Sequence, residues 1–122
     1  MDTFDQKKFS QVLGIEIKNS ALFQEAITHR SYLNEHRHYP YPHNERLEFL
    51  GDAVLELVVT EYLFHHFDNP EGELTSFRAA LVNGDMLAKI GNMLRLQDFL
   101  LMSRGEAKDT GRARTYLIAN AV

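Results

Sequence analysis

The chain has 122 residues, of which 44% are hydrophobic and 25% charged, and a formal net charge of −4. This length and balance are typical of one globular domain and exclude a disordered or fibrous protein. The sequence contains no cysteine, which excludes disulfides, thiolate zinc sites and cysteine nucleophiles and is consistent with a cytoplasmic location. No stretch approaches the roughly 18 consecutive apolar residues of a membrane span, so we expect no membrane partner.

Charge is distributed unevenly along the chain. Residues 44–73 carry eight acids and one arginine, whereas residues 104–114 carry four basic residues and two acids. Residues 28–43 add two arginines and four histidines against one glutamate. The negative total argues against a protein that coats nucleic acid through bulk positive charge. The acidic centre of the chain therefore lies between mildly basic flanks.

The first half of the chain predicts three helices. Residues 5–13 form a helix that stops at a glycine, and residues 21–29 form a second helix capped by Ser20. The stretch YPYPHN interrupts regular structure because of its two prolines. A long helix over residues 44–66 follows.

The second half of the chain is also predicted to be helical. Helices are predicted over residues 74–82 and 86–94, the latter capped by Asp85. The polar, glycine-containing residues 103–114 predict a surface loop. The last eight residues, TYLIANAV, begin an apolar helix without a stop signal, so we expect an incomplete C-terminal helix. The sequence predicts one all-α domain over residues 1–122.

The stretch NERLEFLGDAVLELVV, residues 44–59, is apolar but carries four carboxylates. On a helix, Glu45, Glu48, Asp52 and Glu56 fall in one stripe about 80° wide. Apolar residues fill almost every other direction, which predicts a helix surrounded by packed neighbours. Clustered carboxylates in such a place require a cation. Mg²⁺ is the economical candidate because it accepts one or two carboxylates together with waters and phosphate oxygens.

The members of this stripe are not equivalent. Glu48 and Asp52 are one turn apart and can share an ion, whereas Glu45 could hold an outer water or a second ion. Glu56 could form only a polar edge. The alternative, a solvated helix face, is disfavoured because so few positions remain for water. Gly51 costs about 1 kcal/mol relative to alanine inside a helix, which predicts a tight helix crossing.

Other polar residues predict structural roles. Arg78 lies on an otherwise apolar helix and is expected to pair with a carboxylate inside the fold. The histidines of residues 36–43 follow no helical register and predict surface or hydrogen-bonding roles. No Glu-x-x-His pair, phosphate-binding loop or nucleophile elbow occurs in the sequence.

The stretch NERLEFLGDAVL, residues 44–55, resembles the signature of the ribonuclease III family. Three further blocks resemble other parts of the family in the same order: THRSYLNE at 28–35, EGELTSFRAALVNGDMLAKIG at 71–91 and ARTYLIANAV at 113–122. The resemblance implies the all-helical nuclease domain of a bacterial ribonuclease III, without the double-stranded-RNA-binding domain. It also implies a homodimeric, Mg²⁺-dependent endoribonuclease, with Mn²⁺ able to substitute.

The implied substrate is double-stranded RNA in rRNA or mRNA processing, and no small-molecule substrate is expected. The implied products carry 5′-phosphates and two-nucleotide 3′ overhangs. By the same resemblance, Glu48 and Asp52 are metal ligands with catalytic roles, and Glu45 is a nearby acid that affects activity. Glu71 is an outer acid that reaches the same valley. Phe49 corresponds to an aromatic knob that enters a socket in the partner subunit.

Two departures from the family pattern affect the expected activity. The family usually has an aspartate where this sequence has Asn120, whose carbonyl could bind metal without adding charge, and fewer charges should weaken metal binding. The final metal-ligand glutamate would lie three residues after Asn120, beyond Val122, so we expect feeble or no cleavage. The alternative is a non-catalytic dimerisation or double-stranded-RNA-binding scaffold.

RNA contacts are expected from the basic flank near the C-terminus. A-form RNA is recognised through its shape, its 2′-hydroxyls and its phosphates, so base contacts are not required. Loop solubility is the alternative role for these cations. The candidates for backbone contact are Arg104, Lys108, Arg112 and Arg114.

Overall fold

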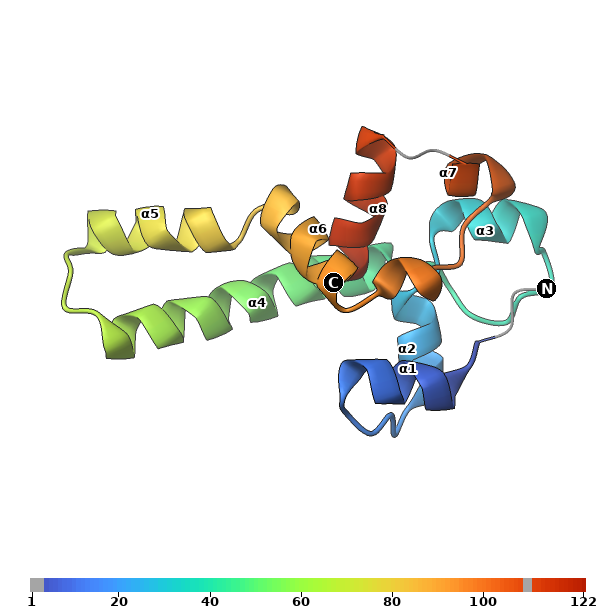
Figure 1. The fold of residues 1–122 in the computed structure, drawn as a ribbon, viewed down its shortest axis with the longest axis horizontal. Coiled ribbons are helices and arrows are strands. Elements are labelled where there is room, and N and C mark those ends of the chain that lie inside the picture. The colour runs from blue at the N-terminus through green and yellow to red at the C-terminus, as the bar shows by residue number, and fades with distance from the viewer. Residues whose placement is uncertain (1–3, 109–110) are drawn as a thin grey trace.

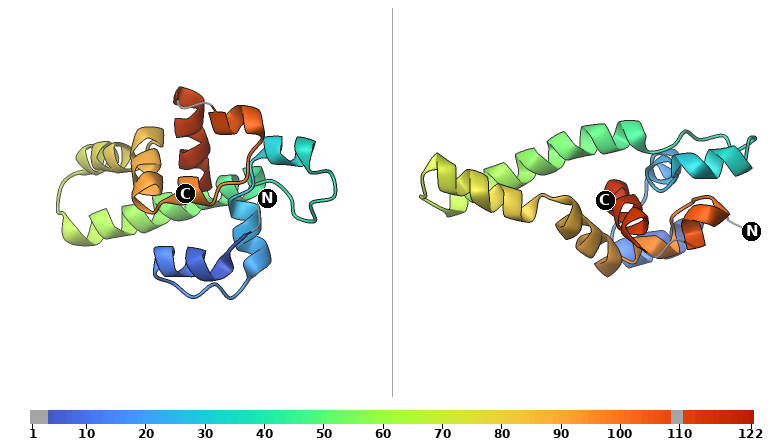
Figure 2. Two further views of the ribbon diagram at one scale, coloured as in Figure 1. Left: turned by 45° about the vertical axis from the view of Figure 1, so that its right-hand side comes forward. Right: turned by 90° about the horizontal axis from the view of Figure 1, so that it is seen from above.

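The computed structural model describes residues 4–108 and 111–122. Within these residues the secondary structure is helical, apart from one isolated β-bridge. The α4–α5 hairpin extends as an arm, while the other helices gather around the base of α4 (Figures 1 and 2). None of the described helices is long and apolar enough to cross a membrane. The predicted all-α class is confirmed. The elements are α1 Gln6–Leu13, α2 Ser20–Ala26, α3 Arg30–Glu35, α4 Glu45–His66, α5 Glu71–Leu81, α6 Gly84–Met93, the 3-10 helix η1 Leu96–Asp98, α7 Arg104–Lys108 and α8 Arg112–Ala121.

The first two helices follow local capping rules. α1 ends at Gly14, whose φ of 71° lies in the left-handed region that glycine tolerates best. The side chain of Asn19, and not Ser20, caps α2 by accepting the N–H of Leu22. α2 also ends earlier than predicted, because Thr28 leaves the helix and forms an isolated parallel bridge. α3 then begins at Arg30, in a stretch for which no separate helix was predicted.

The larger part of the core lies where the N-terminal helices meet the segment after α6. The N–H of His29 donates to the carbonyl of Leu101 at 2.8 Å, and the N–H of Leu101 donates to the carbonyl of Ile27 at 2.9 Å. These bonds join segments that are far apart in the sequence. The buried residues of this cluster are Phe9, Ile17, Ile27, Tyr32, Leu96, Phe99 and Leu101.

The long helix α4 is not surrounded by its own chain, so the prediction of a helix packed on all sides is wrong for the single chain. Leu63 is its only buried residue. A Cβ added at Gly51 would meet nothing within 4 Å, so the predicted tight crossing is absent from the described residues. Seven large apolar side chains of α4 are between 52% and 83% exposed: Phe49, Leu50, Val54, Leu57, Val58, Tyr62 and Phe64.

The second arm helix differs from its prediction in two ways. α5 begins at Glu71, directly after Pro70, and so includes three residues that were not predicted as helical. Arg78 does not pair with a carboxylate among the described residues. Its guanidinium donates to the hydroxyl of Thr60 at 2.9 Å, which ties α5 to α4.

The packing of α6 against α8 forms a second, smaller core around Ala88, Ile118 and Ala119. α6 is capped by Asn83, and not by Asp85 as predicted. The region predicted as one loop over residues 103–114 contains α7 and the beginning of α8. α8 itself confirms the predicted apolar C-terminal helix.

Gly91 allows the close approach of α6 and α8. A Cβ at this buried position would overlap Cγ2 of Ile118 and lie 3.2 Å from Cγ2 of Val122. We expect Gly91→Ala to lower the free energy of unfolding by about 1–2 kcal/mol, because overpacking outweighs the helix propensity that alanine adds. Urea denaturation measures the change. Gly72→Ala is the matched control, since a Cβ there meets nothing within 4 Å, and an equal loss in both variants would contradict the prediction.

Candidate functional site

The base of α4 is fixed by Asn44, a residue that the sequence analysis did not single out. Asn44 is 5% exposed, and its side-chain amide donates to the carbonyl of Ala26 at 3.0 Å. Its own N–H donates to the carbonyl of Thr28 at 2.9 Å, and its carbonyl accepts the N–H of Glu48 at 2.9 Å. Because these bonds satisfy a buried amide, they set where α4 leaves the body of the protein. The signal in the sequence is a polar residue directly before a long apolar helix.

A groove of about 990 Å³ lies beside α4, between this helix and the end of α8. The three predicted metal ligands, Glu48, Asp52 and Asn120, all line it. Tyr116, one helical turn before Asn120, also lines the groove and was not predicted. The fold therefore brings the carboxylates of Glu48 and Asp52, the more distal carboxylate of Glu56 and the amide of Asn120 to one surface.

The electrostatics of the groove come from its unpaired carboxylates. Burial raises the pKa of Glu48, and the negative charges of Asp52 and Glu45 raise it further. Neither Glu48 nor Asp52 forms an ion pair with any residue that the structure describes. A cation between these two carboxylates would therefore be favoured.

The other predicted acids differ in position. Glu56, one turn beyond Asp52, also lines the groove, whereas Glu45 and Glu71 do not. Glu45 forms an ion pair with Arg30 at 3.0 Å and does not line the groove. Glu71 begins α5 at the tip of the arm, whereas Glu48 lies at its base (Figure 1). The 22 residues of α4 span about 33 Å, so the single chain does not bring Glu71 into the valley with Glu48. That expectation is not met within one chain.

The donor set of the groove suits a hard cation. No group of three or more histidine or carboxylate side chains that could hold a metal occurs within the described ranges. The predicted set is the carboxylates of Glu48 and Asp52 with the amide oxygen of Asn120, and Mg²⁺ accepts such a set because it retains several waters. The loop histidines have the predicted surface or hydrogen-bonding roles: Nδ1 of His36 lies 3.1 Å from the carbonyl of Tyr32, Nδ1 of His43 accepts the N–H of Glu45 at 3.4 Å, and His38 is exposed.

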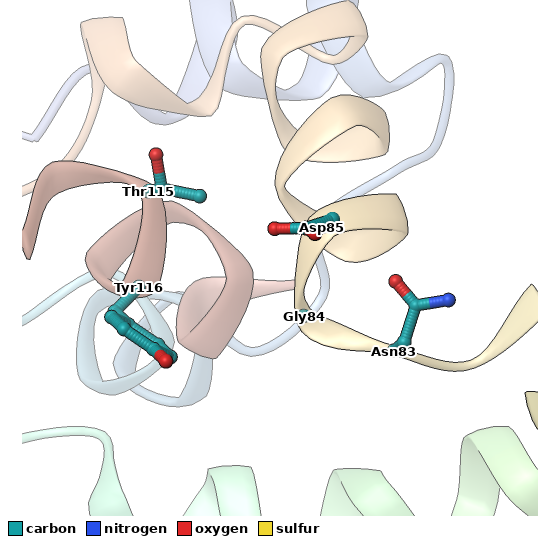
Figure 3. Close-up of a pocket in the computed structure, with 5 residues that line it drawn as sticks. All are labelled: Asn83, Gly84, Asp85, Thr115 and Tyr116. Carbon is teal, nitrogen blue, oxygen red and sulfur yellow. The ribbon is translucent and has the colours of Figure 1, made fainter. Parts of the chain in front are cut away.

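A smaller cavity of about 280 Å³ adjoins the groove at the beginning of α6. In Figure 3, Asp85 and Thr115 lie on neighbouring helices. Asn83, Gly84 and Tyr116 line both the cavity and the groove, so the cavity extends the groove towards the turn before α6.

The predicted RNA-binding residues separate into distinct groups. Arg104 and Lys108 are exposed on α7. Arg114 is half-buried and donates to the carbonyl of Ala107 at 3.0 Å, so it contacts the protein itself. The side chain of Arg112 lies outside the described part of the chain.

The raised pKa of Glu48 makes a prediction about stability. The folded chain binds this proton more readily than the unfolded chain, so the stability that protonated Glu48 contributes is present at acid pH and lost as pH rises through the folded pKa. We expect Glu48→Gln to raise the melting temperature of the metal-free protein at pH 7. The gain should vanish at a pH low enough to protonate Glu48. Differential scanning calorimetry from pH 3 to pH 8 is the measurement.

Glu56→Gln is the control for this experiment, because Glu56 is an exposed carboxylate of the same helix. An equal gain from both variants at pH 7 would indicate a general relief of negative charge and would contradict the assignment to Glu48.

Comparison with known proteins shows the family of the chain. The family model for a ribonuclease-III-like domain matches residues 19–122. The chain is 48% identical over 115 residues to Ribonuclease 3 of a Geobacillus species, covering 93% of this chain and 47% of that protein. It is 43% identical over 121 residues to Ribonuclease 3 of Enterococcus faecalis, covering 98% of this chain and 53% of that protein.

A solved structure of the nuclease domain of ribonuclease III from Campylobacter jejuni has the same fold. It superposes with a TM-score of 0.83 at 46% identity, covering 96% of this chain and 78% of that chain. The chain spans about half the length of the curated relatives that it matches. With a matching family model, these identities and a shared fold, the chain belongs to the ribonuclease III family.

Proposed function

We propose that this chain is the nuclease domain of an Mg²⁺-dependent endoribonuclease that hydrolyses double-stranded RNA. The proposed products carry 5′-phosphates and two-nucleotide 3′ overhangs, and the proposed role is rRNA or mRNA processing. One observation carries the proposal: Glu48, Asp52 and Asn120 line one groove in a chain that belongs to the ribonuclease III family.

Mg²⁺ would be held by the carboxylates of Glu48 and Asp52 and by the amide oxygen of Asn120, and Mn²⁺ could replace it. When bound, the ion supplies positive charge that activates water and offsets the charge that develops on the phosphate. The burial and neighbouring charges that raise the pKa of Glu48 disfavour its ionised form, so a neighbouring cation would stabilise that form. Asn44 would hold these ligands in place by fixing the base of α4.

RNA binding requires cations beside the acidic groove, because phosphates and carboxylates repel each other. The exposed Arg104 and Lys108 of α7 are the candidates for contact with the duplex backbone. Phosphate contacts give affinity without base readout, which suits A-form RNA.

We further propose that a second copy of this chain covers the exposed apolar side chains of α4. Burying seven such side chains would contribute on the order of 5–10 kcal/mol before the entropic cost of association. Phe49 is 83% exposed and is the proposed knob. The Campylobacter jejuni nuclease domain is described as flexible in a region involved in dimer formation, so a dimer is known for a relative with this fold.

The proposed metal site can be tested with variants that add or remove negative charge at its ligands. We expect Asn120→Asp to increase Mg²⁺ affinity roughly tenfold, because it adds a charged ligand, and to increase cleavage of duplex RNA. The double variant Glu48→Gln, Asp52→Asn should lose Mg²⁺ binding and cleavage. Isothermal titration calorimetry and a gel assay with duplex and single-stranded RNA are the measurements. An unchanged Mg²⁺ affinity in the double variant would refute the metal site, and duplex binding without Mg²⁺ binding would favour the scaffold alternative.

The dimer can be tested with a charge on the exposed face of α4. Leu57 is 66% exposed, so Leu57→Glu should leave the single chain folded but weaken the dimer by about tenfold or more. Analytical ultracentrifugation over a concentration series measures the dissociation constant. Leu22→Glu is the matched control, because Leu22 is 48% exposed and belongs to α2, which is not one of the two arm helices. A monomeric wild type, or an equal effect of both variants, would overturn the proposed interface.

A further inference from the structure

The short helix α7 is held to the body of the protein at both ends. It has five residues, and a helix of this length is not stable on its own. At its beginning, the carboxylate of Glu35 accepts the N–H of Arg104, with distances of 3.2 and 3.3 Å to its two oxygens. At its end, the guanidinium of Arg114 donates to the carbonyl of Ala107 at 3.0 Å. An anion at the beginning and a cation at the end both complement the helix dipole.

A second set of hydrogen bonds supports the beginning of α7. The hydroxyl of Ser103 accepts the N–H of Glu106 at 3.2 Å, and the N–H of Ser103 donates to the hydroxyl of Ser31 at 2.9 Å. The Ser31 hydroxyl lies 2.7 Å from Nδ1 of His29, which also accepts the N–H of Ser31 at 3.1 Å. Burial lowers the pKa of His29, which favours the neutral ring that this acceptor role requires. α3 and the residue before it therefore form the support for α7, and Figure 1 shows the two helices side by side.

The two cations of α7 are not used by these contacts. Arg104 takes part through its backbone N–H, and Lys108 lies at the other end of the helix. Both side chains are exposed, and neither forms an ion pair with a described residue. The groups that hold α7 in place are therefore different from the two cationic side chains that α7 exposes to solvent.

We propose that Glu35 and Arg114 are positioning residues that hold α7 so that Arg104 and Lys108 reach the phosphates of duplex RNA. The inference rests on the proposed function and extends it, because it assigns a role in RNA binding to an acidic residue. Arg114 then contributes by holding α7 and not by contacting phosphate.

The direction in which Glu35→Ala changes the affinity for RNA distinguishes a positioning role from a simple charge effect. Removing a negative charge beside a phosphate-binding surface should by itself strengthen RNA binding. If Glu35 positions α7, Glu35→Ala should instead weaken binding of the full chain to duplex RNA about threefold to tenfold, and the dependence of affinity on salt should become shallower. Glu35→Gln keeps an oxygen acceptor for the Arg104 N–H and should recover much of the affinity. Glu16→Ala is the matched control, an exposed glutamate on the loop between α1 and α2, and should have no effect.

Two further measurements complete the test. In an Arg104→Ala, Lys108→Ala background, Glu35→Ala should have no additional effect on affinity, because the cations that it positions are gone. Hydrogen exchange of the α7 amides should accelerate about tenfold in Glu35→Ala, as expected when a hydrogen bond to a charged acceptor is lost. Unchanged exchange, stronger RNA binding by Glu35→Ala, or an equal loss in both backgrounds would overturn the inference. A wild-type chain that does not bind duplex RNA would refute the proposed function, and the exchange data would still decide whether Glu35 holds α7.

Discussion

The structure depends on α4, a helix whose large apolar side chains are mostly left uncovered by its own chain. α4 carries the carboxylates of the groove and seven large exposed apolar side chains, yet only Leu63 is buried. Polar contacts within the chain fix α4 at its base and in the arm: the buried amide of Asn44 and the Arg30–Glu45 ion pair at the base, and the bond from Arg78 to Thr60 in the arm. A helix with this much exposed apolar surface is unusual in a monomer, because such patches mark interaction sites. The projecting arm and the open groove are both consequences of this arrangement.

The same helix also carries a destabilising group. Burial and neighbouring charge disfavour the ionised form of Glu48, so the fold is expected to be less stable at neutral pH than it would be with an uncharged side chain at this position. Destabilising arrangements of this kind persist where function requires them and where other contacts offset the cost. Here the packing of α6 on α8 and the N-terminal core supply those contacts, and neither includes the carboxylates.

The structural features that depend on local sequence pattern were predicted best. The limits of α4 were predicted within one residue, because a long apolar repeat ends in a turn with proline and glycine. Glu48 and Asp52 were placed together because helix geometry alone puts them one turn apart. The prediction that α4 is buried was wrong because hydrophobicity does not distinguish a helix face that the same chain covers from one that it leaves exposed. α3 and α7 were missed because short helices depend on tertiary bonds, such as that from Glu35 to the Arg104 N–H.

α8 connects the acidic and the basic parts of the molecule. Arg114 near its beginning holds α7, while Tyr116 and Asn120 further along line the groove. Asn120 lies six positions after Arg114, a rise of about 9 Å along the helix, so one rigid element sets the separation between the cations of α7 and the carboxylates of α4. α8 is itself placed by its close packing on Gly91 of α6. A shift of α8 would therefore move Arg114 and the groove-lining Asn120 together, so their relative position depends on a tightly packed helix and not on a loop.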